Sequence, residues 1–160
     1  MAFPWYDSFL SQLFQLKKRE QIMKLEFHHI NFVSQNIEEL NMFYKKIMQM
    51  ETIPPEKFPR TAATDKAGYD GKIKFVTEGT MQMHLAEKDL TVASKHNQKI
   101  NPVEKGHIAF RTDDIEEFKV LLKENNIQFS DYGTAFAKEW YQIFFRDPAG
   151  NIIEVHQLLK

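Results

Sequence analysis

The sequence predicts an α+β fold made of two tandem copies of one strand–helix–strand–strand–strand unit. The main observation behind this prediction is an internal repeat: His29 to Leu40 aligns without a gap with His107 to Phe118, 78 residues further on (107 − 29). Both copies carry His, Ile, Phe, Ile, Glu and Glu at the same places. Each copy also begins with the alternation of a strand and continues with the spacing of an amphipathic helix. Such a repeat indicates a duplicated supersecondary unit.

Composition sets the class of protein. At 160 residues the chain is one domain or two small halves that share a core, with 42% apolar and 27% charged residues as in ordinary globular proteins. A net charge of −1 without a basic run argues against a nucleic-acid partner. No apolar run reaches the ~20 residues of a membrane-spanning helix, so we expect no membrane partner. The absence of cysteine excludes disulfides and thiol nucleophiles and fits a reducing cytoplasm, where we expect the protein to act.

The region before the first repeat predicts a helix. Asp7 is a suitable N-cap for a helix running to about Met23, with an apolar stripe between Tyr6 and Leu16. We expect this helix to dock on the domain or on a second subunit, with a lid over the site and attachment to a membrane surface as alternatives. The expected organisation is an N-terminal helical extension (1–24), a first unit (25–90), a linker (91–104) and a second unit (105–160).

The opening strands and helices of the two units share their signals. Asn36 with Glu39, and Asp114 with Glu117, have the spacing of a capping box at a helix start. The strand before the first of these helices alternates from Leu25 to Val33. Side chains two apart share a face of a strand, so His29 and Asn31 are expected on one side and His28 on the other.

The closing strands of each unit form a predicted hairpin. In the first unit a turn-rich stretch precedes the strands 72–76 and 81–86, and His84 shares a face with Gln82. A polar stretch follows, in which His96 is expected to be solvated. In the second unit we expect a short strand at 127–129, a loop at 131–138, and strands at 140–146 and 151–157 joined by a turn at Asp147–Gly150. Glu154 and His156 share a face of the last strand.

Four residues then stand at corresponding places. His29 and His107 open the units, and His84 and Glu154 lie in the closing strands, each between two apolar neighbours. Any one of them alone is more often structural. The repeat makes a shared role the better interpretation, because symmetric placement would bring three imidazoles and one carboxylate together. Such a set suits one divalent transition metal ion: Zn, Ni, Fe, Co or Mn.

These motifs resemble the vicinal oxygen chelate superfamily, which includes glyoxalase I, bleomycin- and fosfomycin-resistance proteins, methylmalonyl-CoA epimerase and extradiol dioxygenases. The resemblance spans about residues 25–157 and is carried by His29-Ile-Asn-Phe leading to Phe43-Tyr44, by Gly106-His-Ile-Ala-Phe110, and by Phe145-Arg-Asp-Pro-Ala-Gly-Asn-Ile-Ile-Glu154. It implies two βαβββ modules whose sheets form a half-open β-barrel around one metal. Matched motif by motif, the ligands are His29, His84, His107 and Glu154.

The resemblance implies a glyoxalase-I-like lyase or isomerase that acts on a small substrate with vicinal oxygens through a metal-stabilised enediolate. Glu154 would be both ligand and catalytic proton shuttle. Glyoxalase I usually has Glu where His84 stands, so an Fe(II) extradiol-type dioxygenase, a thiol transferase and a non-catalytic small-molecule-binding (resistance) protein stay as alternatives. Members of this superfamily often pair, so we expect a homodimer. Four further residues are candidates for the pocket or for contact with the ligands: His156, Asn31, Gln82 and Trp140.

Overall fold

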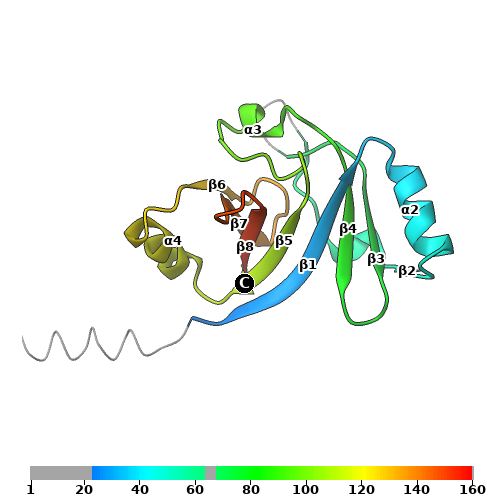
Figure 1. Ribbon diagram of the computed structural model, residues 1–160, viewed down its shortest axis with the longest axis horizontal. Coiled ribbons are helices and arrows are strands. Elements are labelled where there is room, and N and C mark those ends of the chain that lie inside the picture. The colour runs from blue at the N-terminus through cyan, green and yellow to red at the C-terminus, as the bar shows by residue number, and fades with distance from the viewer. Residues whose placement is uncertain (1–22, 64–67, 160) are drawn as a thin grey trace, which may run out of the picture.

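A computed structural model describes residues 23–63 and 68–159 (Figure 1). The expected N-terminal helix lies almost wholly outside these residues. The first unit contains β1 (Leu25–Ser34), α2 (Ile37–Lys46), β2 (Glu51–Thr52), β3 (Ile73–Thr77) and β4 (Gln82–Glu87), with a short η1 helix (Pro55–Lys57). The second contains β5 (His107–Thr112), α4 (Ile115–Glu124), β6 (Phe129–Gly133), β7 (Trp140–Arg146) and β8 (Ile152–Leu158), and α3 (Val92–Lys95) lies between the units.

One sheet of eight strands joins the two units, in the order β2-β3-β4-β1-β5-β8-β7-β6. Within each unit the first and last strands run parallel, β1 beside β4 and β5 beside β8, and β1 meets β5 antiparallel at the centre. The sheet is curved but not closed, with β2 and β6 at its edges (Figure 1). This confirms the predicted class of two βαβββ modules forming a half-open barrel.

The junction of β1 and β5 explains the sequence repeat. Ile30 lies opposite Ile108, and these two residues are 78 apart (108 − 30), which is the offset of the repeat. A local two-fold axis therefore passes between them. On either side of this axis, His29 lies opposite Ala109 and Asn31 opposite His107. The two opening histidines are thus placed symmetrically on neighbouring strands at the centre of the sheet.

Both helices begin where the capping boxes predict. Oδ1 of Asn36 accepts a hydrogen bond from the backbone N–H of Glu39 at 3.2 Å, and Oδ1 of Asp114 accepts one from Glu117 at 2.8 Å. Helix α2 packs on β3 and β4, and α4 packs against β8. Figure 1 shows the two helices at the two ends of the curved sheet, α2 beside β2–β4 and α4 beside β6–β8. No helix among the described residues has the length and apolar character needed to cross a bilayer.

The segment between the units differs from the expected polar linker. It includes α3 and buries Ile100, Pro102 and Val103 against the core. The prediction that His96 is solvated was wrong: its Nε2 lies 3.0 Å from the carbonyl oxygen of Gly68, and its ring packs edge-on against Tyr132. These contacts join segments distant in sequence, so local polarity gave no sign of them. Strand β6 likewise begins at Phe129 and occupies part of the expected loop.

Candidate metal centre

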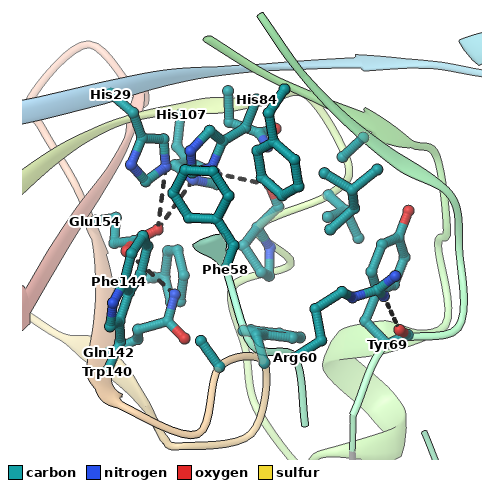
Figure 2. Close-up of a pocket in the computed structure, with 18 of the residues that line it drawn as sticks. His29, Phe58, Arg60, Tyr69, His84, His107, Trp140, Gln142, Phe144 and Glu154 are labelled. Carbon is teal, nitrogen blue, oxygen red and sulfur yellow. Dashed lines mark hydrogen bonds and ion pairs between the residues drawn. The ribbon is translucent and has the colours of Figure 1, made fainter. Parts of the chain in front are cut away.

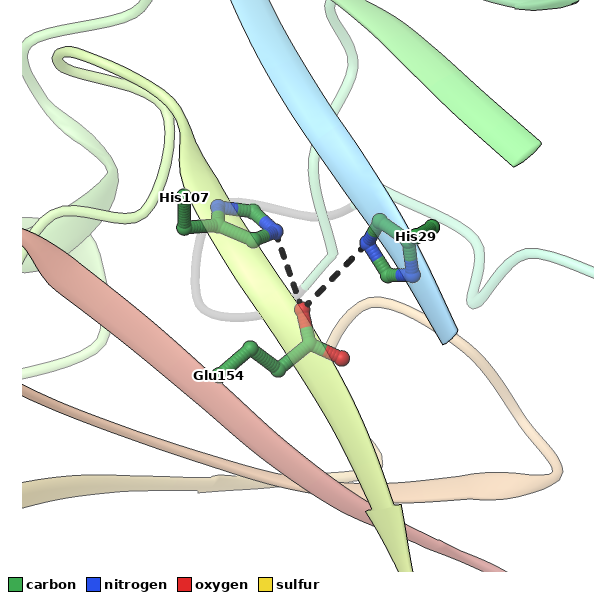
Figure 3. A group of neighbouring side chains, drawn as sticks. All are labelled: His29, His107 and Glu154. Atoms are coloured by element: carbon green, nitrogen blue, oxygen red, sulfur yellow. Dashed lines mark ion pairs between the residues drawn. The ribbon is translucent and has the colours of Figure 1, made fainter. Parts of the chain in front are cut away.

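Two histidines and one carboxylate converge at the centre of the sheet. Oε2 of Glu154 lies 3.0 Å from Nε2 of His107 and 3.8 Å from Nε2 of His29. The possible ligand atoms of these three residues all lie within 4.8 Å of one another. Figure 3 shows them reaching one point from β1, β5 and β8, with both histidines directed at the same carboxylate oxygen. The group could hold a divalent metal ion.

His84 lies beside this group but outside its closest set of atoms. Its ring stacks on the ring of His29, with centroids 3.8 Å apart and an angle of 16° between planes. The side chain is 7% exposed, and its Nε2 has no hydrogen-bond partner in the part of the chain that the structure describes. A buried nitrogen without a partner costs free energy unless something binds it. His84 is therefore a candidate fourth ligand beside the three-residue group.

Burial keeps His29 and His84 neutral, which is the form of histidine that binds metals. It lowers the pKa of His29 well below 6.5, and neighbouring His84 acts in the same direction while Glu154 opposes it. Burial also lowers the pKa of His84 to about 3, again against the influence of Glu154. At neutral pH the imidazoles of His29 and His84 are therefore uncharged and lie beside the carboxylate of Glu154. We call His29, His84, His107 and Glu154 the donor set, and these ligand types fit a divalent transition metal.

Glu154 is held through its other oxygen. Gln142 donates a hydrogen bond from Nε2 to Oε1 of Glu154 at 3.1 Å, and Nδ1 of His156 lies 2.9 Å from the same oxygen. Nδ1 of His156 makes no hydrogen bond of good geometry with any described residue, so this is a close contact rather than a well-formed hydrogen bond. Burial alone would raise the pKa of Glu154, but His107, His156 and His29 outweigh it and hold the pKa well below 4.5. Oε2 is thus the oxygen left for a metal.

A second layer of contacts lies behind the donor set and centres on Arg111. Its guanidinium reaches Nε2 of His28 at 2.8 Å and Nε2 of His156 at 3.3 Å. His28 in turn lies 2.8 Å, Nδ1 to Nδ1, from His29. Because an arginine only donates, both contacted nitrogens act as acceptors. Arg111 therefore ties together residues that touch two members of the donor set.

The position of His28 corrects the expectation from strand alternation. The β1–β5 register shifts between Phe27 and His29, so His28 is the extra residue of a β-bulge. The bulge brings His28 to the same side as His29, with its ring 4.6 Å from that of His156 and 5.0 Å from that of Trp140. The expectation that His28 points away from His29 was wrong.

The donor set lies at one end of a pocket of about 710 Å³, part of it open to solvent (Figure 2). The walls are mainly aromatic and come from both units: Phe58, Phe75, Phe136, Trp140 and Phe144. Figure 2 shows Arg60 and Tyr69 at the end away from the histidines. Two segments meet beside the pocket: the backbone N–H of Thr61 bonds to the oxygen of Phe136 at 3.0 Å, and that of Lys138 to the oxygen of Pro59 at 3.2 Å.

The other candidates from the sequence fall in different places. Asn31 and Trp140 line the pocket. His156 lies behind Glu154 and is fully buried, stacked on Trp140 at 4.6 Å. Gln82 lies opposite His29 in the β1–β4 pair and is not among the residues that line the pocket.

Sequence reasoning missed Gln142, Arg111 and the role of His28. Gln142 could have been found, because the turn at Asp147–Gly150 sets the hairpin register that places it opposite His156. No local signal was available for Arg111 or for the bulge at His28, since both depend on how the two units pair.

Paired βαβββ units around a buried His–His–Glu group define the class of proteins that build one metal site at the junction of two such modules. The sequence model of the glyoxalase/bleomycin resistance protein/dioxygenase superfamily matches residues 26–155, and the chain belongs to this superfamily. A comparison with curated proteins gives no match.

Solved structures show the same fold at low identity. A hypothetical protein, BH1468, from Bacillus halodurans C-125 is 18% identical with a TM-score of 0.59, over 86% of this chain and 96% of that one. Methylmalonyl-CoA epimerase from Mycobacterium tuberculosis is 12% identical with a TM-score of 0.55, over 84% of this chain and 88% of that one. A superfamily member from Vibrio splendidus 12B01 is 12% identical with a TM-score of 0.50, over 86% of this chain and 99% of that one.

Proposed function

We propose that the protein is a divalent-metal-dependent lyase or isomerase for a small substrate with two vicinal oxygens, with a glyoxalase-I-like reaction as the leading case. The proposal is carried by one observation: His84 places beside the group of His29, His107 and Glu154 a buried imidazole nitrogen that has no partner among the described residues. These four residues would hold the ion. When bound, a divalent ion supplies Lewis acidity to neighbouring substrate oxygens.

The same observation favours this reaction over ring cleavage by O₂. Oxygenases of the two-histidine, one-carboxylate type depend on several open metal positions, because both the organic substrate and O₂ must reach the iron. A fourth protein ligand removes one of these positions. If His84 is a ligand, the room that remains suits two substrate oxygens and no third group. The dioxygenase alternative therefore requires that His84 stay off the metal.

The other residues around the site would hold Glu154 in place and keep water from the reacting carbons. Gln142 and His156 keep Oε1 of Glu154 occupied, so Oε2 is the atom available for ligation and for moving a proton between adjacent substrate carbons. The aromatic walls exclude water from the reacting carbons and favour a substrate with an apolar body. Action as a homodimer and a cytoplasmic location stay predictions.

Metal loading tests the proposal first. The protein is stripped with a chelator and reloaded with Ni²⁺, Zn²⁺, Co²⁺, Mn²⁺ or Fe²⁺, and bound metal and thermal stability are measured. We expect about one ion per chain and a higher melting temperature, since ligands that bind only the folded state stabilise it. If no ion is retained and none raises the melting temperature, the enzyme proposal falls.

Substrate turnover then separates the reactions. The hemithioacetal of methylglyoxal and glutathione is incubated with each loaded form in deuterated water, and isomerisation and deuterium uptake are followed by NMR. Oxygen consumption with catechols under Fe²⁺ is measured in parallel. Deuterium uptake without oxygen consumption supports a lyase or isomerase; the reverse result supports the dioxygenase.

A further inference from the structure

The side-chain amide of Gln142 is fixed at one end and free at the other. Its Nε2 donates to Oε1 of Glu154 at 3.1 Å. The amide cannot be turned round, because its oxygen would then face a carboxylate oxygen that only accepts. Oε1 of Gln142 is therefore an acceptor, and within the described part of the chain it has no partner. Figure 2 shows this oxygen pointing away from Glu154.

This free acceptor is a buried atom of a residue that lines the pocket. Gln142 is 5% exposed and lines the cavity together with the donor set. Asn31 is similar: it is buried, lines the same pocket, and its Oδ1 has no partner among the described residues. Asn31 lies opposite both His84 and His107 in the sheet. Buried acceptors without partners are uncommon because they cost free energy, and in a pocket the missing donor belongs to a ligand or water.

We propose that Gln142 contacts the substrate and accepts a hydrogen bond from a hydroxyl or N–H group beside the two chelating oxygens. The inference rests on the proposed function, because it assumes that the oxygens face the donor set. The hydrogen bond from Nε2 of Gln142 ties its amide to Glu154, a member of that set, so we expect the substrate's donor group beside its chelating oxygens. The substrate class is therefore a vicinal oxygen compound with an adjacent hydrogen-bond donor and an apolar body.

Two simple chelators test this inference. Benzohydroxamate and N-methylbenzohydroxamate both present two vicinal oxygens and a phenyl ring, and only the first has an N–H beside them. Their affinities for the Zn²⁺-loaded protein are measured by calorimetry. We expect the wild type to prefer the N–H form by roughly 10- to 100-fold, as a site with an otherwise unpaired acceptor should.

Two variants test whether the Gln142 amide causes the preference for the N–H chelator. Gln142→Met keeps the length of the side chain and removes its acceptor, so the preference should fall to about 1-fold, measured at saturating metal because the contact with Glu154 is lost too. Gln82→Met is the matched control: it removes a glutamine that does not line the pocket, and the preference should persist. A preference that survives in Gln142→Met reflects the bulk of the methyl group and overturns the inference.

Measurements on the wild type distinguish a failure of the role of Gln142 from a failure of the proposed function. Equal affinity of the metal-loaded wild type for both chelators overturns the role of Gln142 and leaves the proposed function standing. A wild type that binds no metal overturns both.

Discussion

His84 and Glu154 occupy corresponding places in the two halves of the sheet. His84 lies opposite Asn31 in the β1–β4 pair, and Glu154 lies opposite Ala109 in the β5–β8 pair. Asn31 and Ala109 are 78 residues apart (109 − 31), the offset of the repeat. One unit therefore offers an imidazole where the other offers a carboxylate. This asymmetry leaves a single carboxylate in the donor set, and in the proposed function the choice of reaction depends on whether His84 binds the metal.

Replacing His84 tests whether it is a ligand. His84→Ala should weaken Zn²⁺ binding by at least 10- to 100-fold, the usual cost of losing even a residue that only supports a ligand. Competition with a chromophoric chelator measures the change. His96→Ala is the control, because His96 contacts Gly68 and Tyr132 and does not line the pocket. Equal affinities of wild type and His84→Ala would make His84 a structural residue and reopen the dioxygenase alternative.

The parts of this site that were predictable from sequence are those set by local pattern and by the repeat. The ungapped alignment of His29 with His107 is reproduced by the pairing of Ile30 with Ile108. The helix starts follow from the capping boxes at Asn36 and Asp114. Each of these depends on residues close in sequence, or on symmetry between two copies.

The remaining features depend on pairing between distant segments. The bulge at His28 exists only because β1 meets β5 with a shifted register. Arg111 reaches His28 and His156, which are 83 and 45 residues away in sequence. Alternation, capping and turn signals carry no information about such contacts. The contacts that Arg111 makes with His28 and His156 behind the donor set could therefore not be predicted from the sequence.

The contacts of Arg111 with His28 and His156 lead to a second prediction about metal binding. Arg111→Met removes the guanidinium donors to His28 and His156, so His156 is no longer fixed against Glu154. We expect Zn²⁺ affinity to fall by about 10- to 100-fold and the visible spectrum of the Co²⁺ form to change, because the ligand geometry loosens. Arg146→Met is the control, since Arg146 bonds to Gly150 at the surface turn. An unchanged Co²⁺ spectrum in Arg111→Met would show that Arg111 does not position the ligands.

Gly106 is required for the strand that carries His107. Its φ is +91°, and a Cβ there would lie 2.3 Å from the backbone oxygen of Asn31. Gly106→Ala should therefore destabilise the protein by several kcal/mol, combining about 1–2 kcal/mol for the left-handed backbone with the cost of a clash against a strand. Urea unfolding measures the loss.

Gly150 supplies the matched comparison for that variant. Its φ is +86°, but a Cβ there meets nothing within 4 Å. Gly150→Ala should show the backbone cost alone, so it should be clearly less destabilised than Gly106→Ala. Similar losses for the two variants would mean that the close approach of Gly106 to Asn31 does not constrain the strand.

The stability of the metal-free protein should depend on pH through its buried histidines. The pKa of His84 is lowered to about 3 in the folded state, against 6.5 when unfolded, and the pKa of His29 is lowered too. As pH falls below about 6.5, the unfolded chain takes up protons that the folded chain does not, so the free energy of unfolding decreases. The slope is about 1.4 kcal/mol per pH unit for each such histidine.

Urea titrations with a chelator present, between pH 7.5 and 5, measure this slope above the range where the low pKa of Glu154 matters. His84→Leu replaces the imidazole with an apolar side chain that cannot titrate. The slope should therefore fall by up to about 1.4 kcal/mol per pH unit, the contribution of one histidine. Loading with Zn²⁺ should raise stability most at the upper end of the range, because metal and protons compete for the same imidazoles. A free energy of unfolding that stays constant from pH 7.5 to 5 would contradict the assignment of these histidines as buried and neutral.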